Sequence, residues 1–355
     1  MASRNSTRVF AVSLFLIAIS LFFLTGYGKT IRVCKTGCSY TTLQPAIDDA
    51  DPGDVIQVQN GDYAGNVVIT KPVTIKGTRP TWTIISPSVT DTPLVQVNTT
   101  DGEVRLEGLG LEGNEKVDLL SAGGSGNVRL NDCRLTAGKA GIIVTNSASV
   151  KAIEVVLETS ALGGLINEGG EGTFLKSEIE DNGEGFRVED DAKLTLIESL
   201  LARNDGAGIT VKNTGLANVL SSTIADNDGS GLKVTNFSRL KLQESKVNGN
   251  ETGGVLLSGS ANAELVDNEI LNNGGKNLSV ISERCGFSGG DAGFYGVVTG
   301  SDNKIVPANS KTICPIDLSV VNSEDGGTYS YFFSPSTLAF IGVISAATLY
   351  FILGR

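Results

Sequence analysis

The sequence predicts an all-β fold, a single-stranded right-handed parallel β-helix of about 10–11 coils with a period of roughly 23 residues. Three observations predict it: a repeat of 23 residues, short segments in which apolar and polar residues alternate, and Gly, Asn and Asp between those segments. Hydrophobic residues make up 40% of the 355 residues, enough to fill a long core. We expect one repeat array over residues 53–306.

The repeat is visible in several independent columns of residues. Polar residues recur at steps of 23, at Asp181, Asn204, Asn227, Asn250 and Asn273. Four residues later come Gly185, Gly208, Gly231, Gly254 and Asn277. Apolar columns keep the same step, for example Leu196, Val219, Leu242 and Leu265, and the pattern extends backwards through Gly141 and Gly164.

The asparagine column indicates a structural ladder. Stacked coils place equivalent residues about 4.8 Å apart, so that each amide can bond to the one above it. Asn also tolerates the left-handed backbone of a tight turn. Leucine-rich repeats need a Leu-x-x-Leu-x-Leu pattern, and helical solenoids need longer repeats of helix-forming residues; the sequence shows neither pattern.

Both ends of the array need covering, because exposed core and unpaired strand edges promote aggregation. Residues 29–52 are predicted to form an N-terminal cap with a short capping helix within the segment Tyr40–Ala50. Thr42 is expected to cap this helix, and Pro45 lies in its tolerated first turn. Residues 307–331 are predicted to form a C-terminal cap or stalk.

The two termini predict export and a membrane partner. Residues 1–28 have basic residues, an apolar run and small residues in the order of a signal peptide. Residues 332–355 are apolar and end in Arg355, which predicts a C-terminal transmembrane helix or a processed sorting tail. The expected location is the cell surface, as a single-pass membrane protein, or the exterior after tail processing.

Charge limits the classes of ligand. The chain has 28 Lys and Arg against 39 Asp and Glu, a formal net charge of −11. Nucleic acid is excluded as the expected partner, because phosphate binding needs a basic face. The same balance argues against acidic polymers unless a cation bridges them.

The five cysteines fit an oxidising compartment. The preferred pairing is Cys34 with Cys38 and Cys285 with Cys314, although spacing alone leaves other connectivities open. Cys133 is then expected in the core, and it cannot be activated by histidine because the chain has none.

A family resemblance lies in the N-terminal segments Tyr40–Ile47, Gly61-Asp62-Tyr63 and Lys71–Gly77 and in the later coils. These stretches resemble pectin-lyase-like β-helix proteins, which include pectin methylesterases and NosD-like surface proteins. The resemblance implies the β-helix fold and, for its enzymes, polysaccharide substrates bound on the outside of one sheet. It also suggests copper handling, but the chain has no His and its only Met is the initiator.

One outward face offers candidate binding residues. We expect an outward column that contains Ile143, Ile166, Arg187, Thr210, Lys233, Leu256 and Ser279, beside a second column with Glu189 and Lys212. Arg187, Glu189, Lys212 and Lys233 are the candidate ligand-binding residues. Inverting hydrolysis needs a carboxylate cluster that these columns do not contain, whereas a lyase could use a basic residue beside bound calcium. A solvated face of mixed charge is the other interpretation.

Asp190 and Asp191 are candidate calcium ligands, since hard cations prefer oxygen, but turn formation accounts for the same residues. No other cofactor is expected. Asn98 and Asn236 begin glycosylation sequons in predicted loops. The favoured function is a non-catalytic cell-surface module that binds or adheres to glycans or envelope components. The alternatives are a polysaccharide lyase or hydrolase and a purely structural envelope protein.

Overall fold

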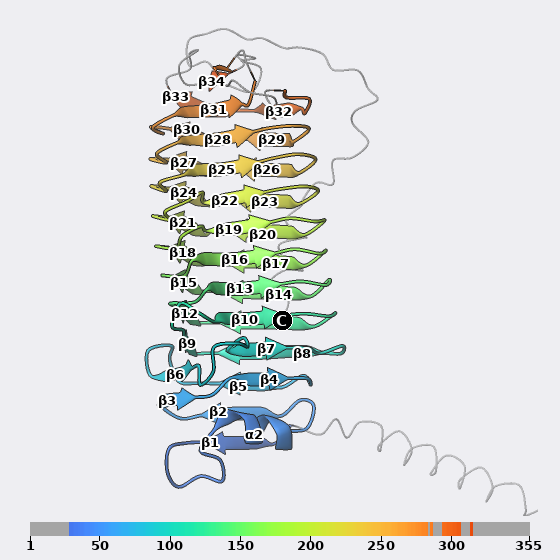
Figure 1. Ribbon diagram of the computed structural model, residues 1–355, viewed down its shortest axis with the longest axis vertical. Helices are drawn as coiled ribbons and strands as arrows, with labels where there is room; N and C mark the ends of the chain where they lie inside the picture. Colours follow the sequence, from blue (N-terminus) through green and yellow to red (C-terminus); the bar gives the residue numbers. More distant parts are fainter. Residues whose placement is uncertain (1–27, 283–284, 287–292, 307–312, 315–355) are drawn as a thin grey trace, which may run out of the picture.

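The computed structural model describes residues 28–282, 285–286, 293–306 and 313–314. The chain winds into a rod of stacked coils, and each coil after the first contributes one strand to each of three parallel sheets (Figure 1). We name these sheets A, B and C in the order in which the chain passes through them. The predicted signal peptide (1–28), stalk (307–331) and C-terminal tail (332–355) lie wholly or almost wholly outside the described residues.

The strands of each sheet follow the chain along the rod axis. Sheet A contains β1 (Thr30–Val33), β2 (Val55–Val58), β5 (Thr74–Lys76), β8 (Glu103–Glu107), β11 (Asn127–Asn131), β14 (Ser149–Ile153), β17 (Glu171–Leu175), β20 (Lys193–Ile197), β23 (Leu216–Leu220), β26 (Arg239–Gln243), β29 (Asn262–Val266) and β32 (Val298–Ser301). Sheet B contains β3 (Gly61–Ala64), β6 (Thr83–Ser86), β9 (Gly110–Glu112), β12 (Arg134–Thr136), β15 (Val156–Glu158), β18 (Glu178–Glu180), β21 (Leu200–Ala202), β24 (Thr223–Ala225), β27 (Lys246–Asn248), β30 (Glu269–Leu271) and β33 (Lys304–Val306). Sheet C contains β4 (Val67–Ile69), β7 (Val95–Val97), β10 (Asp118–Ala122), β13 (Ala140–Val144), β16 (Leu162–Ile166), β19 (Phe186–Val188), β22 (Ile209–Val211), β25 (Ser230–Val234), β28 (Gly253–Leu257), β31 (Lys276–Val280) and β34 (Ile313–Cys314).

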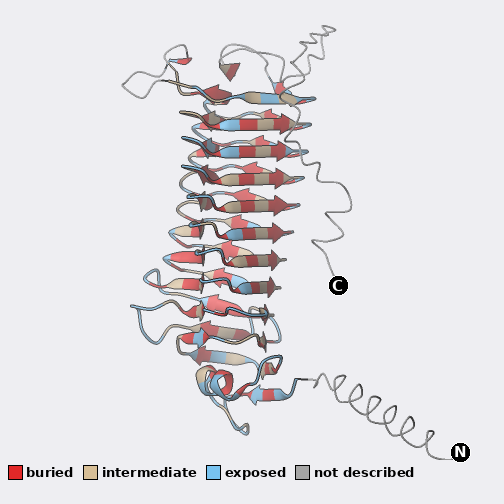
Figure 2. Ribbon diagram, turned by 90° about the vertical axis from the view of Figure 1, so that its right-hand side faces the viewer, coloured by how far each residue is buried: buried red, intermediate tan, exposed pale blue. Residues whose placement is uncertain are grey.

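The interior is one continuous hydrophobic core along the whole rod. Inward side chains alternate with outward ones on most strands, as the colours of Figure 2 show. Leu196, Val219, Leu242 and Leu265 stack in register, which confirms the predicted apolar column. The predicted glycine column needs small residues because the coils approach closely there. An added Cβ at Gly208 would lie 2.8 Å from the carbonyl oxygen of Gly231.

The coil length changes from 22 to 23 residues, and this corrects two predicted columns. Phe186 pairs with Gly164 on one side, a step of 22, and with Ile209 on the other, a step of 23. Asn182, not Asp181, therefore lies in register with Asn204. For the same reason Leu165, not Ile166, aligns with Arg187. A one-residue slip moves a strand residue to the opposite face.

Two polar ladders run inside the corners of the coils. We call Asn182, Asn204, Asn227, Asn250 and Asn273 the asparagine ladder, which lies between sheets B and C. Each of its amides donates to the Oδ1 atom of the next residue, with distances of 2.8–3.2 Å along the ladder, and Asn273 ends it by donating to Asn277. Ser177, Ser199, Ser222 and Ser245 form a serine ladder between sheets A and B, in which each backbone N–H donates to the next side chain.

The predicted capping helix is corrected by the structure. Helix α2 (Leu43–Asp49) has only seven residues, and Thr42 stands at its N-cap without making a side-chain hydrogen bond. It packs against β1 and β4, so it takes the place of a sheet C strand in the first coil. Strand β1 is still the outermost strand of sheet A. The helix therefore belongs to the first coil and is not a lid over the rod.

The predicted transmembrane helix is also not supported. Among the described residues no helix is long and apolar enough to cross a membrane, and residues 332–355 lie outside them. With a rise of about 1.5 Å per residue, α2 covers only a fraction of the roughly 30 Å that a membrane span requires.

The predicted disulfides are present. Cys34 pairs with Cys38 in the loop after β1, and Cys285 pairs with Cys314 at the other end of the rod. Such bonds are typical of proteins outside the reducing cytosol. Cys133 is a free, buried thiol, and burial raises its pKa to about 12. Its thiol is therefore protonated at neutral pH, as expected for a core residue.

Candidate functional site

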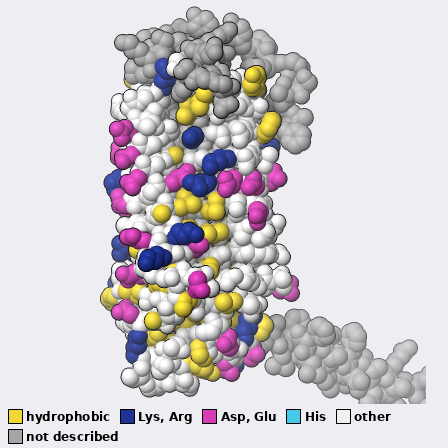
Figure 3. All heavy atoms as spheres, in the orientation of Figure 1, with side chains coloured by type: hydrophobic (Ala, Val, Ile, Leu, Met, Phe, Trp, Pro, Cys, Tyr) yellow, Lys and Arg dark blue, Asp and Glu magenta, His cyan; other side chains and the backbone are white. Residues whose placement is uncertain are grey.

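The predicted binding face lies on the outside of sheet C. Arg187, Thr210 and Lys233 are in register on β19, β22 and β25. The Nε atom of Arg187 donates to Glu184 Oε2 at 3.1 Å, so this guanidinium is already paired. Figure 3 shows cationic and anionic side chains mixed at mid-height on the rod, with hydrophobic side chains close by.

Glu189 and Lys212 follow β19 and β22 directly, so all four predicted ligand-binding residues lie on neighbouring coils. In the described part of the chain, no ion pair joins Glu189, Lys212 or Lys233 to another residue. The structure brings the predicted residues together, but their role in binding stays a prediction.

Asp190 and Asp191 take part in turn formation. Both have a left-handed backbone, with φ of 56° and 63°. Asp190 accepts a hydrogen bond from the Asn213 amide at 2.6 Å, and the backbone N–H of Asp191 donates to Thr214 at 2.9 Å. The described residues contain no group of three or more Asp, Glu, His or Cys that could hold a metal ion. Calcium binding at this turn has no further support.

Sheet A carries a column of three basic residues that the sequence analysis missed. Arg105, Arg129 and Lys151 are in register on the consecutive strands β8, β11 and β14, and we call them the basic column. Each lies between two buried residues of an alternating strand, as in Val104-Arg105-Leu106, so each points outward. That alternation was the signal available in the sequence.

The basic column is only partly neutralised. The Glu103 carboxylate lies 3.3 Å from Arg105 Nε and 2.8 Å from Arg129 Nε. Lys151 has no carboxylate within ion-pair distance among the described residues. Partial burial, and then the positive charge of Arg129, lower the pKa of Lys151, while Glu103 acts in the opposite direction. The column therefore ends in a cation that lacks a counter-charge.

The charges are divided unequally between sheets A and B. Outward positions of sheet A carry eight cations and four carboxylates: Arg32, Lys76, Arg105, Arg129, Lys151, Lys193, Arg239 and Lys241 against Glu103, Glu107, Glu171 and Glu264. Outward positions of sheet B carry three cations and six carboxylates: Arg134, Lys246 and Lys304 against Asp62, Glu112, Glu158, Glu178, Glu180 and Glu269. The outer face of sheet A is therefore basic although the protein is net acidic.

The predicted glycosylation residues are accessible. Asn98 and Asn236 are both exposed, whereas Asn250 and Asn277, which also begin sequons, are buried. Modification of Asn98 and Asn236 stays a prediction.

Known structures of the same fold include polysaccharide-active enzymes. Protein ORF18 of Geobacillus virus E2 superposes with a TM-score of 0.60 at 12% identity, over 83% of this chain and 65% of the viral protein. The A-module of the mannuronan C-5 epimerase AlgE6 of Azotobacter vinelandii gives a TM-score of 0.54 at 15% identity, over 75% of this chain and 93% of the module. The catalytic unit of a GH87 α-1,3-glucanase from Streptomyces thermodiastaticus gives 0.52 at 14% identity, over 80% and 69%. At these identities the likeness concerns the fold alone.

A comparison with curated proteins by sequence finds no match. The family model described as "right handed beta helix region" matches residues 119–311, which is more than half of the chain. The expected resemblance to pectin-lyase-like β-helix proteins is thus confirmed at the level of fold. The chain belongs to the family of proteins with a right-handed β-helix region.

Proposed function

We propose that this protein binds an acidic polysaccharide along the outer face of sheet A, with the basic column as the anchor. The observation that carries the proposal is the register of Arg105, Arg129 and Lys151 on consecutive strands, together with the missing counter-charge at Lys151. Adjacent strands place these cations about 4.8 Å apart in a straight line. A linear polymer with repeated carboxylates matches such a line.

The chemistry of the column suits uronate groups. Guanidinium groups recognise carboxylates through paired, charge-assisted hydrogen bonds. Beyond Lys151 the same column continues with Thr173, Thr195 and Asn218, whose hydroxyl and amide groups can bond to sugar hydroxyls. The column would thus hold a chain by charge at one end and by neutral hydrogen bonds further along.

The local charge of a face decides ligand choice at short range, because charges more than about 10 Å apart are largely screened at 0.1 M salt. The net charge of −11 had argued against acidic polymers, but it sums over all faces of the rod. Outward positions of sheet B carry a surplus of three carboxylates and those of sheet A a surplus of four cations, so the remaining negative charge lies outside these two sheets. Fold relatives named for mannuronan and α-1,3-glucan make a polysaccharide a reasonable ligand class.

Binding is tested by calorimetric titration with a polyuronate and with a neutral glucan as comparison. We expect the double variant Arg129→Ala, Lys151→Ala to lose at least about tenfold in affinity for the polyuronate, because each lost charged contact contributes about 1.5–3 kcal/mol. The matched control is Lys246→Ala, Lys304→Ala, which removes two cations from sheet B, where both pair with Glu269.

The control should bind like the unaltered protein. An equal loss of polyuronate affinity in both double variants would show that binding depends on the net charge of the protein and not on the basic column. No polyuronate binding by the unaltered protein would reject the proposal and favour a structural rod.

A second candidate function is chemistry on the same polymer, with Lys151 as a proton acceptor. Its lowered pKa favours this role, because a general base works best when its pKa approaches the working pH. In an elimination, Lys151 in its neutral form would take the proton next to the uronate carboxylate. The neighbouring glycosidic bond would break as a double bond forms, and the leaving oxygen would take a proton from water. Incubation with polyuronate, followed by ultraviolet absorbance for unsaturated product, tests this step. Turnover that persists unchanged in Lys151→Met would exclude Lys151 as the base.

A further inference from the structure

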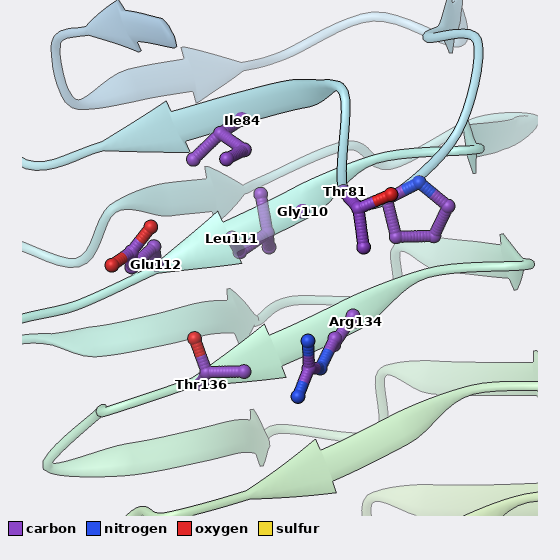
Figure 4. Close-up of a pocket in the computed structure, with 8 residues that line it drawn as sticks. Thr81, Ile84, Gly110, Leu111, Glu112, Arg134 and Thr136 are labelled. Atoms are coloured by element: carbon purple, nitrogen blue, oxygen red, sulfur yellow. The ribbon is translucent and has the colours of Figure 1, made fainter.

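Sheet B has a separate pocket near the N-terminal end of the rod, away from the basic column. Its floor is a two-by-two patch made of Gly110 and Glu112 on β9 and, in register with them, Arg134 and Thr136 on β12. The loop that contains Pro80 and Thr81 covers one side, and Ile84 of β6 completes the wall. Figure 4 shows the side chains of Thr81, Glu112, Arg134 and Thr136 around this one space.

The loop is seated on the sheet by specific contacts. Gly110 takes the position that Arg134 and Ile84 occupy on the neighbouring strands, and an added Cβ there would lie 2.2 Å from the Pro80 carbonyl oxygen. The Thr83 side chain, which is fully buried, accepts a hydrogen bond from the Thr78 N–H at 3.1 Å. The glycine and the buried hydroxyl together hold the loop against β9, so the pocket has fixed walls.

The polar groups on the floor are arranged to bind hydroxyls. Arg134 is ion-paired with Glu158 of β15, which orients its guanidinium. Glu112 has no ion-pair partner in the described part of the chain, so its carboxylate can accept hydrogen bonds. An acceptor, a donor and the Thr136 hydroxyl thus lie side by side below the apolar surfaces of Pro80 and Ile84.

The size and charge of the pocket select one class of ligand. Its volume of about 260 Å³ corresponds to roughly nine water molecules at about 30 Å³ each, which is room for one sugar ring. Glu112 disfavours an anionic sugar, whereas the charge of Arg134 is already offset by Glu158. A neutral sugar combines an apolar face with several hydroxyls, as the walls and floor require.

We propose that this pocket binds one neutral sugar residue of a glycan, through hydrogen bonds to Glu112, Arg134 and Thr136. The site is independent of the acidic-polymer site on sheet A. The protein would therefore contact two kinds of sugar on two faces, as a glycan with both neutral and uronate residues would require.

Trp82 gives a direct signal for this site. It is the only tryptophan of the chain, 48% exposed, and it directly follows Pro80 and Thr81, with the Arg79 guanidinium 4.7 Å from its ring centre. Its fluorescence is followed while methyl glycosides of neutral hexoses are added, with a methyl uronide as comparison. We expect a saturable change with a neutral glycoside and a much weaker response to the uronide.

Two variants and one matched control decide the proposal. Glu112→Gln is expected to weaken neutral-sugar binding by about tenfold, since it removes a charged acceptor. Gly110→Ala is expected to abolish the binding by displacing the loop. Glu178→Gln removes an exposed carboxylate from β18 of the same sheet and should change nothing.

The absence of a saturable change with any neutral hexoside overturns the proposal, as does unaltered binding in Glu112→Gln or equal binding of the uronide. The double variant Arg129→Ala, Lys151→Ala should leave this titration unchanged. The absence of neutral-sugar binding at this pocket can therefore be distinguished from the absence of polyuronate binding on sheet A.

Discussion

The asparagine ladder and the basic column both run along the rod in register, one inside a coil corner and the other on an outer face. Inside, one residue type recurs on five consecutive coils, and each amide bonds to the next. Outside, Arg105, Arg129 and Lys151 give way to Thr173 on the next strand. The polar groups of a buried column need hydrogen-bond partners in the neighbouring coils, whereas exposed residues can bond to water and are free to vary. The inner columns therefore carry the fold, and the non-repeating outer columns are where binding can be selected.

The largest expected effect comes from breaking the inner column. Asn227→Ala removes the acceptor of the Asn204 amide at 2.8 Å and the donor to Asn250 at 2.8 Å, and it leaves a cavity. We expect a loss of about 4 kcal/mol in the free energy of unfolding, from unsatisfied buried groups and lost packing. Urea denaturation measures it. Asn248→Ala, on the outer face of β27, is the matched control. An equal loss of unfolding free energy in this variant would show that the buried ladder is no more important for stability than an outward asparagine.

A smaller effect is expected in the serine ladder. The Ser222 hydroxyl accepts from the Ser199 N–H at 3.1 Å and donates to the Leu220 carbonyl at 2.8 Å. Ser222→Ala should cost about 1–2 kcal/mol of unfolding free energy, because one buried N–H loses its partner. Ser149→Ala, on the outer face of β14, should stay within about 0.5 kcal/mol of the unaltered protein. A Ser222→Ala protein as stable as that control would show that the ladder is dispensable.

The next prediction concerns how polyuronate binding by the basic column depends on pH. The folded-state pKa of Lys151 lies below its ordinary value of 10.5, so the side chain loses its proton earlier in the folded protein as pH rises. Polyuronate affinity should fall through that alkaline window by up to about tenfold, the loss of one charged contact. The free energy of unfolding should rise with pH in the same window, since Lys151 there keeps its proton in the unfolded chain but loses it in the folded protein. Lys151→Arg, which stays charged, should remove both slopes; slopes that persist in this variant would assign them to another group.

The smallest expected effect is a gain in polyuronate affinity. Thr173→Lys extends the basic column by one strand and should raise polyuronate affinity about threefold, with unfolding free energy unchanged within about 0.5 kcal/mol. The same substitution at Thr223 on sheet B adds equal charge to the opposite kind of face. If both variants gain equally, net charge rather than the column governs binding.

The predicted columns from Asn204 onward match the structure, because each inward residue packs on its counterpart in the next coil and the same residue type suits every coil. The alignment failed where a coil is one residue shorter. Asp181 precedes Asn182, and Gly163 precedes Gly164, so two alignments satisfied the same pattern at those points. Only the hydrogen-bonded register separates them.

The sequence by itself determined the coiled all-β architecture and its buried ladders, since these follow from local alternation and from contacts that repeat in every coil. Tertiary structure alone decided which outward residues meet. Arg105, Arg129 and Lys151 stand at unequal steps along the chain and belong to no repeat, yet strand pairing aligns them on sheet A. The pocket beside Gly110 likewise depends on how the Pro80 loop folds back across sheet B. Such sites arise between coils, and no single coil encodes them.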